Sequence, residues 1–289
     1  MELGIGPLSF SLTGELPPTA RALAEHYPPP ARPAGRYTLH FTHEPGPAFI
    51  PLPPPLAGAR YQMDVEEQPD EILCTSYFFR ARLPQSRADD APLAAQAIWR
   101  PAPPEHEPLI IHNILRNWAA YLLPRHRILL LHAGGAVIQE QAVLFTGTSG
   151  AGKSTATAFC GDSFPTLGDD IVGLDFRGAE VNVLPIPCFN AKAPPTAPIR
   201  EWPLGMINRI IKAEHHRLER LPPPAALSTL VSQAPFINVR SASLETGLDL
   251  LLESIHRLPV FRLELMKNKG FIPLLEREMA ARTAAAGRG

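Results

Sequence analysis

The stretch of this chain with the clearest chemistry is residues 147–154, which read Gly-Thr-Ser-Gly-Ala-Gly-Lys-Ser. They match the phosphate-binding pattern G-x-x-x-x-G-K-[ST] at every fixed position. Glycines let backbone N–H groups approach phosphates without steric conflict, and the N-terminus of a following helix adds unsatisfied donors. The pattern therefore predicts a P-loop that binds the phosphates of a nucleoside triphosphate. The residues expected to contact the nucleotide are Gly147, Thr148, Ser149, Gly150, Ala151, Gly152, Lys153, Ser154 and Thr155.

Two kinds of side chain in and after this loop are suited to phosphoryl transfer. We expect Lys153 to reach the β- and γ-phosphates and the hydroxyl of Ser154 to bind Mg²⁺. Asp169 and Asp170 follow Gly168 at the head of an apolar run. One carboxylate could hold Mg²⁺, directly or through water, while the other takes the proton from an attacking hydroxyl. Adjacent strand residues face opposite ways, so the sequence leaves open which aspartate does which, and whether the pair only forms a turn.

A histidine lies upstream of the loop, in the segment Leu-His-Ala-Gly-Gly at residues 131–135. His132 ends an apolar run that we expect to neighbour the strand leading into the loop. The glycines beside it would allow a ligand to approach the backbone closely. The alternative is a histidine whose hydrogen bonds are satisfied in the core or in a turn.

The spacing of apolar residues predicts most of the helices and strands that must position these residues. Residues 109–122 repeat apolar side chains at helical spacing and are followed by Pro124, which predicts an amphipathic helix. Three apolar runs come next, at residues 128–132, 136–138 and 142–146. Residues 139–141 are too few for a crossover between parallel strands, so the last two runs should form an antiparallel hairpin leading into the loop.

Beyond the loop we expect a second hairpin, with strands at residues 171–176 and 180–184. The remaining predicted elements are helices at residues 153–160, 244–258 and 274–285 and a strand at residues 260–265. The first hundred residues instead alternate apolar and polar side chains at residues 36–43, 61–65 and 72–83, with Pro- and Gly-rich turns between them. We therefore expect a small β-rich N-terminal domain at residues 1–105, in which a substrate-docking role would be reasonable, and a P-loop domain at residues 106–289.

Composition describes an ordinary globular chain, with 45% hydrophobic and 19% charged residues. A formal net charge of −1 argues against a general nucleic-acid binder or a polybasic membrane-surface protein. No apolar run is long enough to span a membrane, and the N-terminus does not resemble a signal peptide, so we expect a cytoplasmic enzyme. The three cysteines, Cys74, Cys160 and Cys188, are expected to be buried apolar filler. Whether the chain forms a homo-oligomer is left open.

Taken together, the histidine segment, the short hairpin, the loop and the aspartate pair resemble the catalytic domain of HPr kinase/phosphorylase, over roughly residues 109–190. They resemble still more the smaller HPr-kinase-like proteins, some of which phosphorylate serine in ribosomally made peptides. The resemblance implies an α/β fold with the mixed sheet and flanking helices of HPr kinase and phosphoenolpyruvate carboxykinase. It implies that Mg²⁺ binds Ser154 with Asp169 or Asp170, that the other aspartate is the general base, and that His132 lines the site. It also suggests Lys192 as a substrate-contacting residue, with a solvated loop lysine as the alternative.

The downstream signature of HPr kinase proper, which contains arginine and asparagine, has no counterpart here, because residues 236–240 match it too loosely. Phosphorolysis, HPr as the substrate and a hexameric assembly are therefore not implied. The segments that an ABC-type ATPase or a GTPase needs are also missing from the sequence.

The leading interpretation is an ATP- and Mg²⁺-dependent kinase that phosphorylates a serine hydroxyl of a peptide or protein. The alternatives are a kinase of a small hydroxylated metabolite and a non-catalytic nucleotide-binding regulator. A basic stretch on a predicted helix could meet an acidic substrate or leader peptide, or could simply be a solvated face. Its members are Arg209, Lys212, His215, His216 and Arg217.

Overall fold

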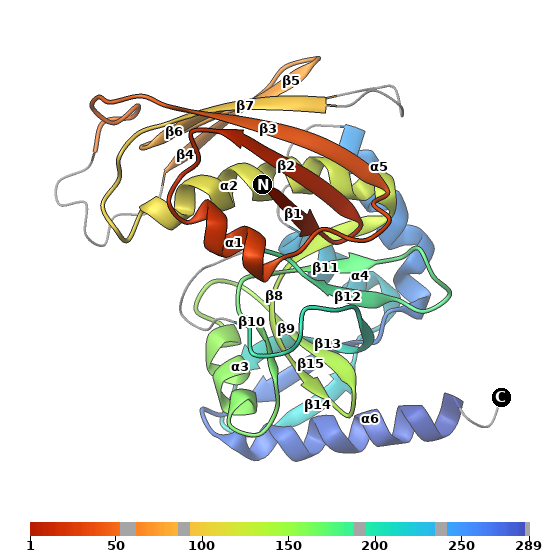
Figure 1. The fold of residues 1–289 in the computed structure, drawn as a ribbon. Helices are drawn as coiled ribbons and strands as arrows, with labels where there is room; N and C mark the ends of the chain where they lie inside the picture. The colour runs from red at the N-terminus through yellow and green to blue at the C-terminus, as the bar shows by residue number, and fades with distance from the viewer. Residues whose placement is uncertain (53–61, 86–92, 188–194, 235–241, 287–289) are drawn as a thin grey trace. The chain divides into compact units, whose positions relative to one another are not determined.

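The computed structural model describes residues 1–52, 62–85, 93–187, 195–234 and 242–286, which form two mixed sheets and six α-helices (Figure 1). Contacts within the chain divide it into two compact units, Met1–Ala119 and Ala120–Gly289. The sequence placed the boundary near residue 105. No described helix is long and apolar enough to cross a membrane.

The first unit is built on a seven-stranded mixed sheet of order β1-β2-β3-β7-β6-β5-β4. Its strands are β1 (Glu2–Ile5), β2 (Leu8–Gly14), β3 (Gly35–His43), β4 (Met63–Glu67), β5 (Glu71–Ser76), β6 (Phe79–Pro84) and β7 (Leu93–Trp99), and α1 is Ala20–His26. The β-rich character is confirmed, but the single strand expected at residues 72–83 is two strands. Their turn contains Tyr77 and Phe78, which are both buried, so its composition carries no turn signal.

Helix α2 (Glu107–Leu122) is the amphipathic helix that the sequence predicts. Its apolar face is buried, and the ring of Trp118 lies 5.5 Å from those of Phe10 and Tyr37 in the first sheet. Aromatic side chains bury large areas and pack edge to face, as Trp118 does here. This packing explains why most of α2 belongs to the first unit. A short 3-10 helix (Leu123–His126) follows it.

The second unit contains an eight-stranded sheet in which β9 lies between β8 and β13. The strands are β8 (Ile128–Ile138), β9 (Gln141–Thr146), β10 (Thr166–Gly168), β11 (Ile171–Asp175), β12 (Asn182–Pro185), β13 (Trp202–Lys212), β14 (Arg217–Arg220) and β15 (Val260–Leu265). The helices are α3 (Lys153–Gly161), α4 (Pro223–Gln233), α5 (Ala242–Ser254) and α6 (Ile272–Ala286). β8 runs antiparallel to β9, β10 and β11, whereas β13 runs parallel to β9 and β15.

The hairpin that leads into the glycine-rich loop is confirmed. Ile138 pairs with Gln141, and the two residues between them, Gln139 and Glu140, have φ angles of 50° and 59°. Positive φ at both central residues is the geometry of a type I′ turn, whose twist matches that of the strands. The apolar runs at residues 128–132 and 136–138 are one continuous strand, β8, and not two.

Two apolar clusters fix the helices on opposite sides of this sheet. One contains Phe145 of β9, Ala156 of α3 and Leu275 of α6, and the other contains Leu144 of β9 and Leu230 of α4. Each fully buried large apolar side chain contributes roughly 1.5–3 kcal/mol. The neighbours Leu144 and Phe145 point to opposite faces, so β9 is held from both sides and the loop that follows it starts from a fixed point.

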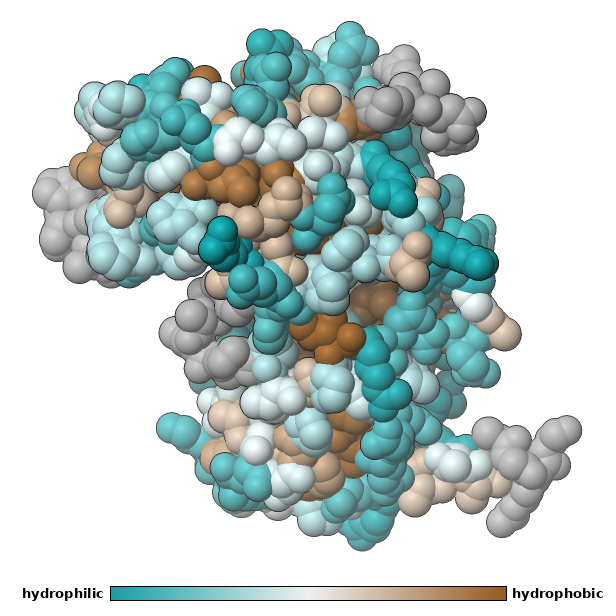
Figure 2. Space-filling view, viewed as in Figure 1, coloured by the Kyte–Doolittle hydropathy of each residue, from teal (hydrophilic) through white to brown (hydrophobic). Residues whose placement is uncertain are grey.

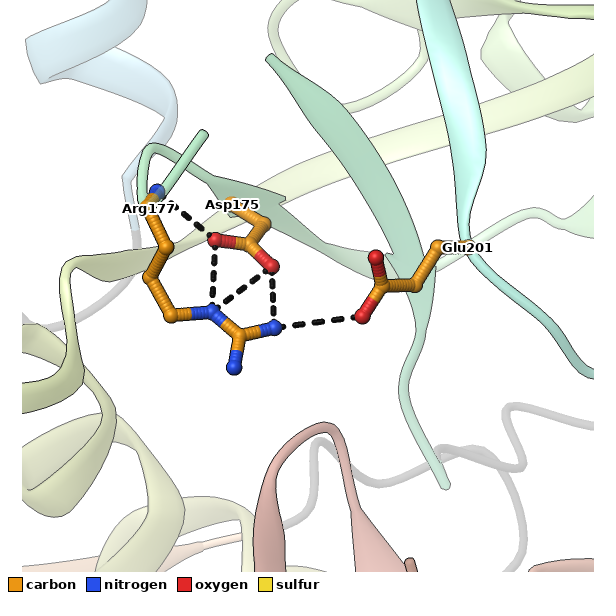
Figure 3. A network of polar contacts seen from close by, with 3 residues as sticks. All are labelled: Asp175, Arg177 and Glu201. Carbon is orange, nitrogen blue, oxygen red and sulfur yellow. Dashed lines mark hydrogen bonds and ion pairs between the residues drawn. The ribbon is translucent and has the colours of Figure 1, made fainter. Parts of the chain in front are cut away.

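A polar network lies at the C-terminal end of β11, in the hairpin that connects β11 to β12 (Figure 3). The guanidinium of Arg177 donates hydrogen bonds to both carboxylate oxygens of the buried Asp175, and it also reaches Glu201 at 3.1 Å. The hydrogen bond that Arg177 donates to Asp175 raises the pKa of Arg177. This hairpin is the second one that the sequence predicts.

The helix predicted for the basic stretch is wrong, because these residues lie on two strands and the turn between them. Arg209 and Lys212 lie on β13, His215 and His216 lie in the turn after it, and Arg217 begins β14. β13 has neighbours on both edges and apolar residues facing both clusters, so its sequence lacks the alternation by which a half-buried strand is recognised.

Two of the three cysteines, Cys74 and Cys160, are buried and free, as expected. Cys188, Lys192 and the segment at residues 236–240 lie outside the described residues.

Candidate active site

The glycine-rich loop, residues 147–152, connects β9 to α3 through a backbone that depends on its glycines. Gly147, Gly150 and Gly152 have φ angles of 145°, 77° and 112°. A Cβ on Gly147 would lie 3.1 Å from that of Ala151, whereas a Cβ on Gly150 would meet nothing within 4 Å. Non-glycine residues rarely adopt these conformations. The loop therefore presents bare backbone to an open space at its centre.

Helix α3 begins directly after this loop. Its N-cap residue is Gly152, and no side-chain hydrogen bond caps the helix. The first N–H groups of an α-helix have no partner within the helix, and they carry the positive end of its dipole. Ser154 and Thr155 occupy this first turn. The N-terminal end of α3 therefore presents hydrogen-bond donors and a positive electrostatic potential to the loop.

Lys153 lies under the loop. Its Nζ donates hydrogen bonds to the carbonyl of Gly147 at 2.7 Å and to that of Thr148 at 3.3 Å, and the residue is only 7% exposed. Burial lowers the pKa of Lys153, while the carboxylates of Asp170 and Asp169 oppose this shift. The lysine therefore lies within the electrostatic reach of both aspartates.

The two aspartates occupy the bend between β10 and β11. The backbone carbonyl of Asp170 accepts a hydrogen bond from the N–H of Ala133 at 3.1 Å. A Cβ on Gly134 would lie 2.4 Å from Oγ1 of Thr157 and 3.1 Å from Cα of Asp169. The missing side chain at Gly134 thus lets β8 approach α3 and the aspartate bend closely.

His132 lies on β8 opposite the start of β11, because Ile171 pairs with it. Its Nδ1 is 3.3 Å from Oδ1 of Asp170, with 40% of the histidine side chain and 12% of the aspartate side chain exposed. The hydroxyl of Thr146 donates a hydrogen bond to the carbonyl of His132 at 3.1 Å. This histidine is neither a core residue nor a turn residue, since it belongs to a strand and faces a carboxylate.

These residues meet in one pocket of about 440 Å³. It is lined by His132, Ser149, Gly150, Gly152, Lys153, Ser154, Thr155, Asp169 and Asp170. All of them were singled out from the sequence. Gly147, Thr148 and Ala151 belong to the loop without lining the pocket.

One contact of the loop was not anticipated. The N–H of Gly147 donates to Oε1 of Gln233 at 3.3 Å, which ties the loop to the end of α4. Gln233 is distant in sequence and belongs to no motif, so no signal could have indicated it.

The donor set also bears on metal binding. No group of three or more His, Cys, Asp or Glu side chains that could hold a metal ion occurs in the described part of the chain. A cation in the pocket would therefore have one or two carboxylates and the Ser154 hydroxyl as protein ligands. Mg²⁺ is usually bound in this way, with substrate phosphates and water completing its octahedron.

No protein-family model matches the chain, and no curated protein matches its sequence. Among solved structures, the HPr(Ser) kinase/phosphatase from Coxiella burnetii matches 55% of this chain and 99% of its own, with 13% sequence identity and a TM-score of 0.29. The structural similarity to this kinase is weak, and a TM-score of 0.29 is too low to bear on the chemistry of the pocket.

Proposed function

We propose that this chain is a kinase that transfers the γ-phosphoryl group of ATP to a serine hydroxyl of a peptide or protein, with Mg²⁺, in the cytoplasm. The observation that supports the proposal is the convergence of Lys153, Asp169 and Asp170 on one pocket beside a glycine-rich loop. Phosphoryl transfer needs little covalent chemistry from a protein, only positioning and neutralisation of charge. A P-loop lysine, backbone donors and carboxylates are the groups that this chemistry uses.

In this proposal the loop and the first turn of α3 hold the phosphates. The bare backbone at Gly150 and the uncapped N–H groups of α3 donate hydrogen bonds to phosphate oxygens. Lys153 exchanges its bonds to the carbonyls of Gly147 and Thr148 for bonds to the β- and γ-phosphates. Burial makes the positive charge of Lys153 energetically unfavourable, and the negative charge of the phosphates then compensates for it.

Ser154 and Asp169 would hold Mg²⁺, which when bound neutralises the charge of the phosphate oxygens. Asp170 accepts the proton of the acceptor hydroxyl as its oxygen attacks the γ-phosphorus, and the bond from that phosphorus to the bridging oxygen breaks to release ADP. His132 holds the Asp170 carboxylate in place through Nδ1. A positioned carboxylate base contributes roughly 10²–10⁴-fold to the rate of such a step.

The choice of a serine in a peptide or protein as acceptor follows the resemblance of the histidine segment, loop and aspartate pair to HPr-kinase-like sequences. A small hydroxylated metabolite as acceptor, or nucleotide binding without transfer, would use the same loop. The acceptor therefore has to be established by experiment.

The test is transfer of label from γ-labelled ATP, with Mg²⁺, to proteins and peptides of a cell lysate by the purified chain. We expect label on serine, lost in Lys153→Ala and kept in the matched control Lys267→Ala, whose lysine is exposed and lies outside the pocket. Label on a small molecule alone would favour the metabolite kinase. Binding of ATP by the wild type, lost in Lys153→Ala, with no transfer to any fraction, would favour the regulator.

A further inference from the structure

A row of cross-strand neighbours runs from the base of the glycine-rich loop across three more strands. Thr146, the last residue of β9, pairs with Arg209 of β13, Arg209 pairs with Arg262 of β15, and Arg262 pairs with Glu219 of β14. Figure 1 draws β13, β15 and β14 near one another in the second unit. Neighbouring strands lie about 4.8 Å apart, so Arg262 is roughly 10 Å from the base of the loop.

This row lies on a part of the sheet that the described helices leave exposed. Side chains two residues apart along a strand share a face, so Ile207 and Val260 share the face of Arg209 and Arg262. Ile207 and Val260 are buried in the cluster with α4 and α5. Arg209 and Arg262 are exposed. The helices therefore cover this face only up to the row that begins at the loop.

Among the residues that the structure describes, the apolar surface offers no comparable feature. The large apolar residues that are exposed in the described part of the chain are scattered, at Met1, Leu52, Val65, Ile199 and Leu252. On the face drawn in Figure 2, brown apolar residues likewise form separate patches among hydrophilic ones.

The charges of this face are only partly balanced. Glu264 is paired with Arg262 and, at 2.7 Å, with His215, while Arg217 lies 3.3 Å from Glu219. The side chain of Arg209 forms no hydrogen bond or ion pair with any residue that the structure describes, although it is directly opposite Arg262.

Like charges directly opposite each other on neighbouring strands destabilise a sheet. Glu264 pairs with Arg262, so Arg209 is the member of this pair whose charge has no described partner. An unmatched charge of this kind is expected where function requires it. An anion bound between Arg209 and Arg262 would remove the repulsion and provide the missing partner.

We propose that Arg209, Arg217 and Arg262, here called the arginine platform, dock an acidic segment of the peptide that the pocket phosphorylates. The proposal rests on the proposed kinase function. Guanidinium groups pair with single carboxylates through charge-assisted hydrogen bonds, which suits separate Glu or Asp side chains.

A nucleic acid fits the platform less well. Glu219 and Glu264 are interleaved with the arginines on the same face, and the formal net charge of the chain is −1. A phosphate backbone requires a continuous basic track, which these carboxylates interrupt.

The test measures peptide binding to the full chain without nucleotide, by fluorescence anisotropy at low salt. One labelled peptide carries glutamates around a central serine, and its control carries glutamines instead. We expect the glutamate peptide to bind about tenfold more tightly, equivalent to about 1.4 kcal/mol. Arg209→Glu should abolish the difference, whereas Arg277→Glu, a charge reversal at an exposed position of α6, should preserve it.

Equal binding of the two peptides to the wild type would overturn the proposal, as would an equal loss of binding in Arg277→Glu. Tighter binding of a single-stranded oligonucleotide that also depends on Arg209 would replace the peptide by a nucleic acid. Label transfer from ATP is measured separately on the bound peptide. If the glutamate peptide binds through Arg209 but neither it nor any lysate fraction receives phosphate on serine, the kinase proposal fails and the docking surface stands.

Discussion

His132 on β8 faces Asp170, the residue that precedes β11, with Nδ1 of the histidine 3.3 Å from Oδ1 of the aspartate. The relationship is set by the backbone, because Ile171 pairs with His132 and the carbonyl of Asp170 accepts the N–H of Ala133. Both side chains line the pocket that contains Lys153. A histidine held in this way can fix the orientation of the carboxylate that we propose as the base.

Asp170→Asn should therefore lower kcat for phosphoryl transfer by about 10²–10⁴-fold, because the amide cannot accept the proton of the acceptor. His132→Ala should lower kcat by a smaller factor, since it removes only the group that holds the base. Both variants should bind ATP with nearly the wild-type Kd, because neither removes a phosphate ligand. Steady-state kinetics and calorimetric titration with ATP measure the two quantities, and full turnover by Asp170→Asn would show that the base is another group.

Ser154→Ala should raise the Mg²⁺ concentration that gives half-maximal rate, because the hydroxyl proposed as a metal ligand is lost. Ser154→Thr keeps a hydroxyl and should stay close to wild type. The measurement is the rate of transfer as a function of free Mg²⁺ at saturating ATP. An unchanged Mg²⁺ dependence in Ser154→Ala would remove Ser154 from the set of metal ligands.

Gly134→Ala should disturb the aspartate bend. The new Cβ would lie 2.4 Å from Oγ1 of Thr157 and 3.1 Å from Cα of Asp169, and overpacking of this kind costs about 1–3 kcal/mol. We expect a lower free energy of unfolding in urea together with reduced transfer. Gly178→Ala, at an exposed turn, is the control and should change stability by much less. Wild-type stability of Gly134→Ala would mean that β8 and α3 can separate without penalty.

The site could be predicted from the sequence where its residues form local patterns. The glycine-rich loop, the aspartate pair and the hairpin before the loop each occupy a few consecutive residues, and the structure brings Lys153, Asp170 and His132 together in one pocket. Their roles in catalysis remain predictions. The contact between Gly147 and Gln233 joins residues 86 positions apart, and no local pattern encodes it.

The sequence predicted the fold less well where buried residues replace the usual alternation of apolar and polar side chains or the usual turn residues. β13 is buried on both faces over much of its length, so its apolar run does not alternate, and the basic residues at its end suggested a helix instead. The turn between β5 and β6 contains buried Tyr77 and Phe78 in place of Gly, Pro or Asn, which made two strands appear as one. In both places tertiary packing outweighs local propensity.

Cys74 and Cys160 should be unreactive in the folded protein. Burial raises the pKa of each thiol from 9.0 to about 12, and only the thiolate reacts with thiol reagents. In a Cys188→Ser background, we expect no modification by a thiol-specific chromogenic reagent at mildly alkaline pH until denaturant is added. Fast reaction under native conditions would show that these segments open readily.

The same shifts give the sign of a pH effect on stability. Above the unfolded pKa of 9.0 the unfolded chain releases thiol protons that the folded chain keeps. The stability contributed by the protonated thiols is therefore complete below pH 9 and is lost as the pH rises toward about 12. Urea unfolding of the Cys188→Ser protein over this range should show a steeper loss of stability than unfolding of a Cys74→Ala, Cys160→Ala, Cys188→Ser protein.

Asp175→Ala should destabilise the second unit without affecting catalysis. Asp175 is 3% exposed and accepts hydrogen bonds from both the backbone and the guanidinium of Arg177, and hydrogen bonds to charged groups are worth about 1.5–3 kcal/mol. Glu253→Ala removes the exposed ion pair with Arg127 and should cost less than about 1 kcal/mol. Asp175 lies at the end of β11 remote from Asp170. Transfer by the folded Asp175→Ala protein should therefore equal that of the wild type, and reduced kcat at full folding would mean that the two ends of β11 are coupled.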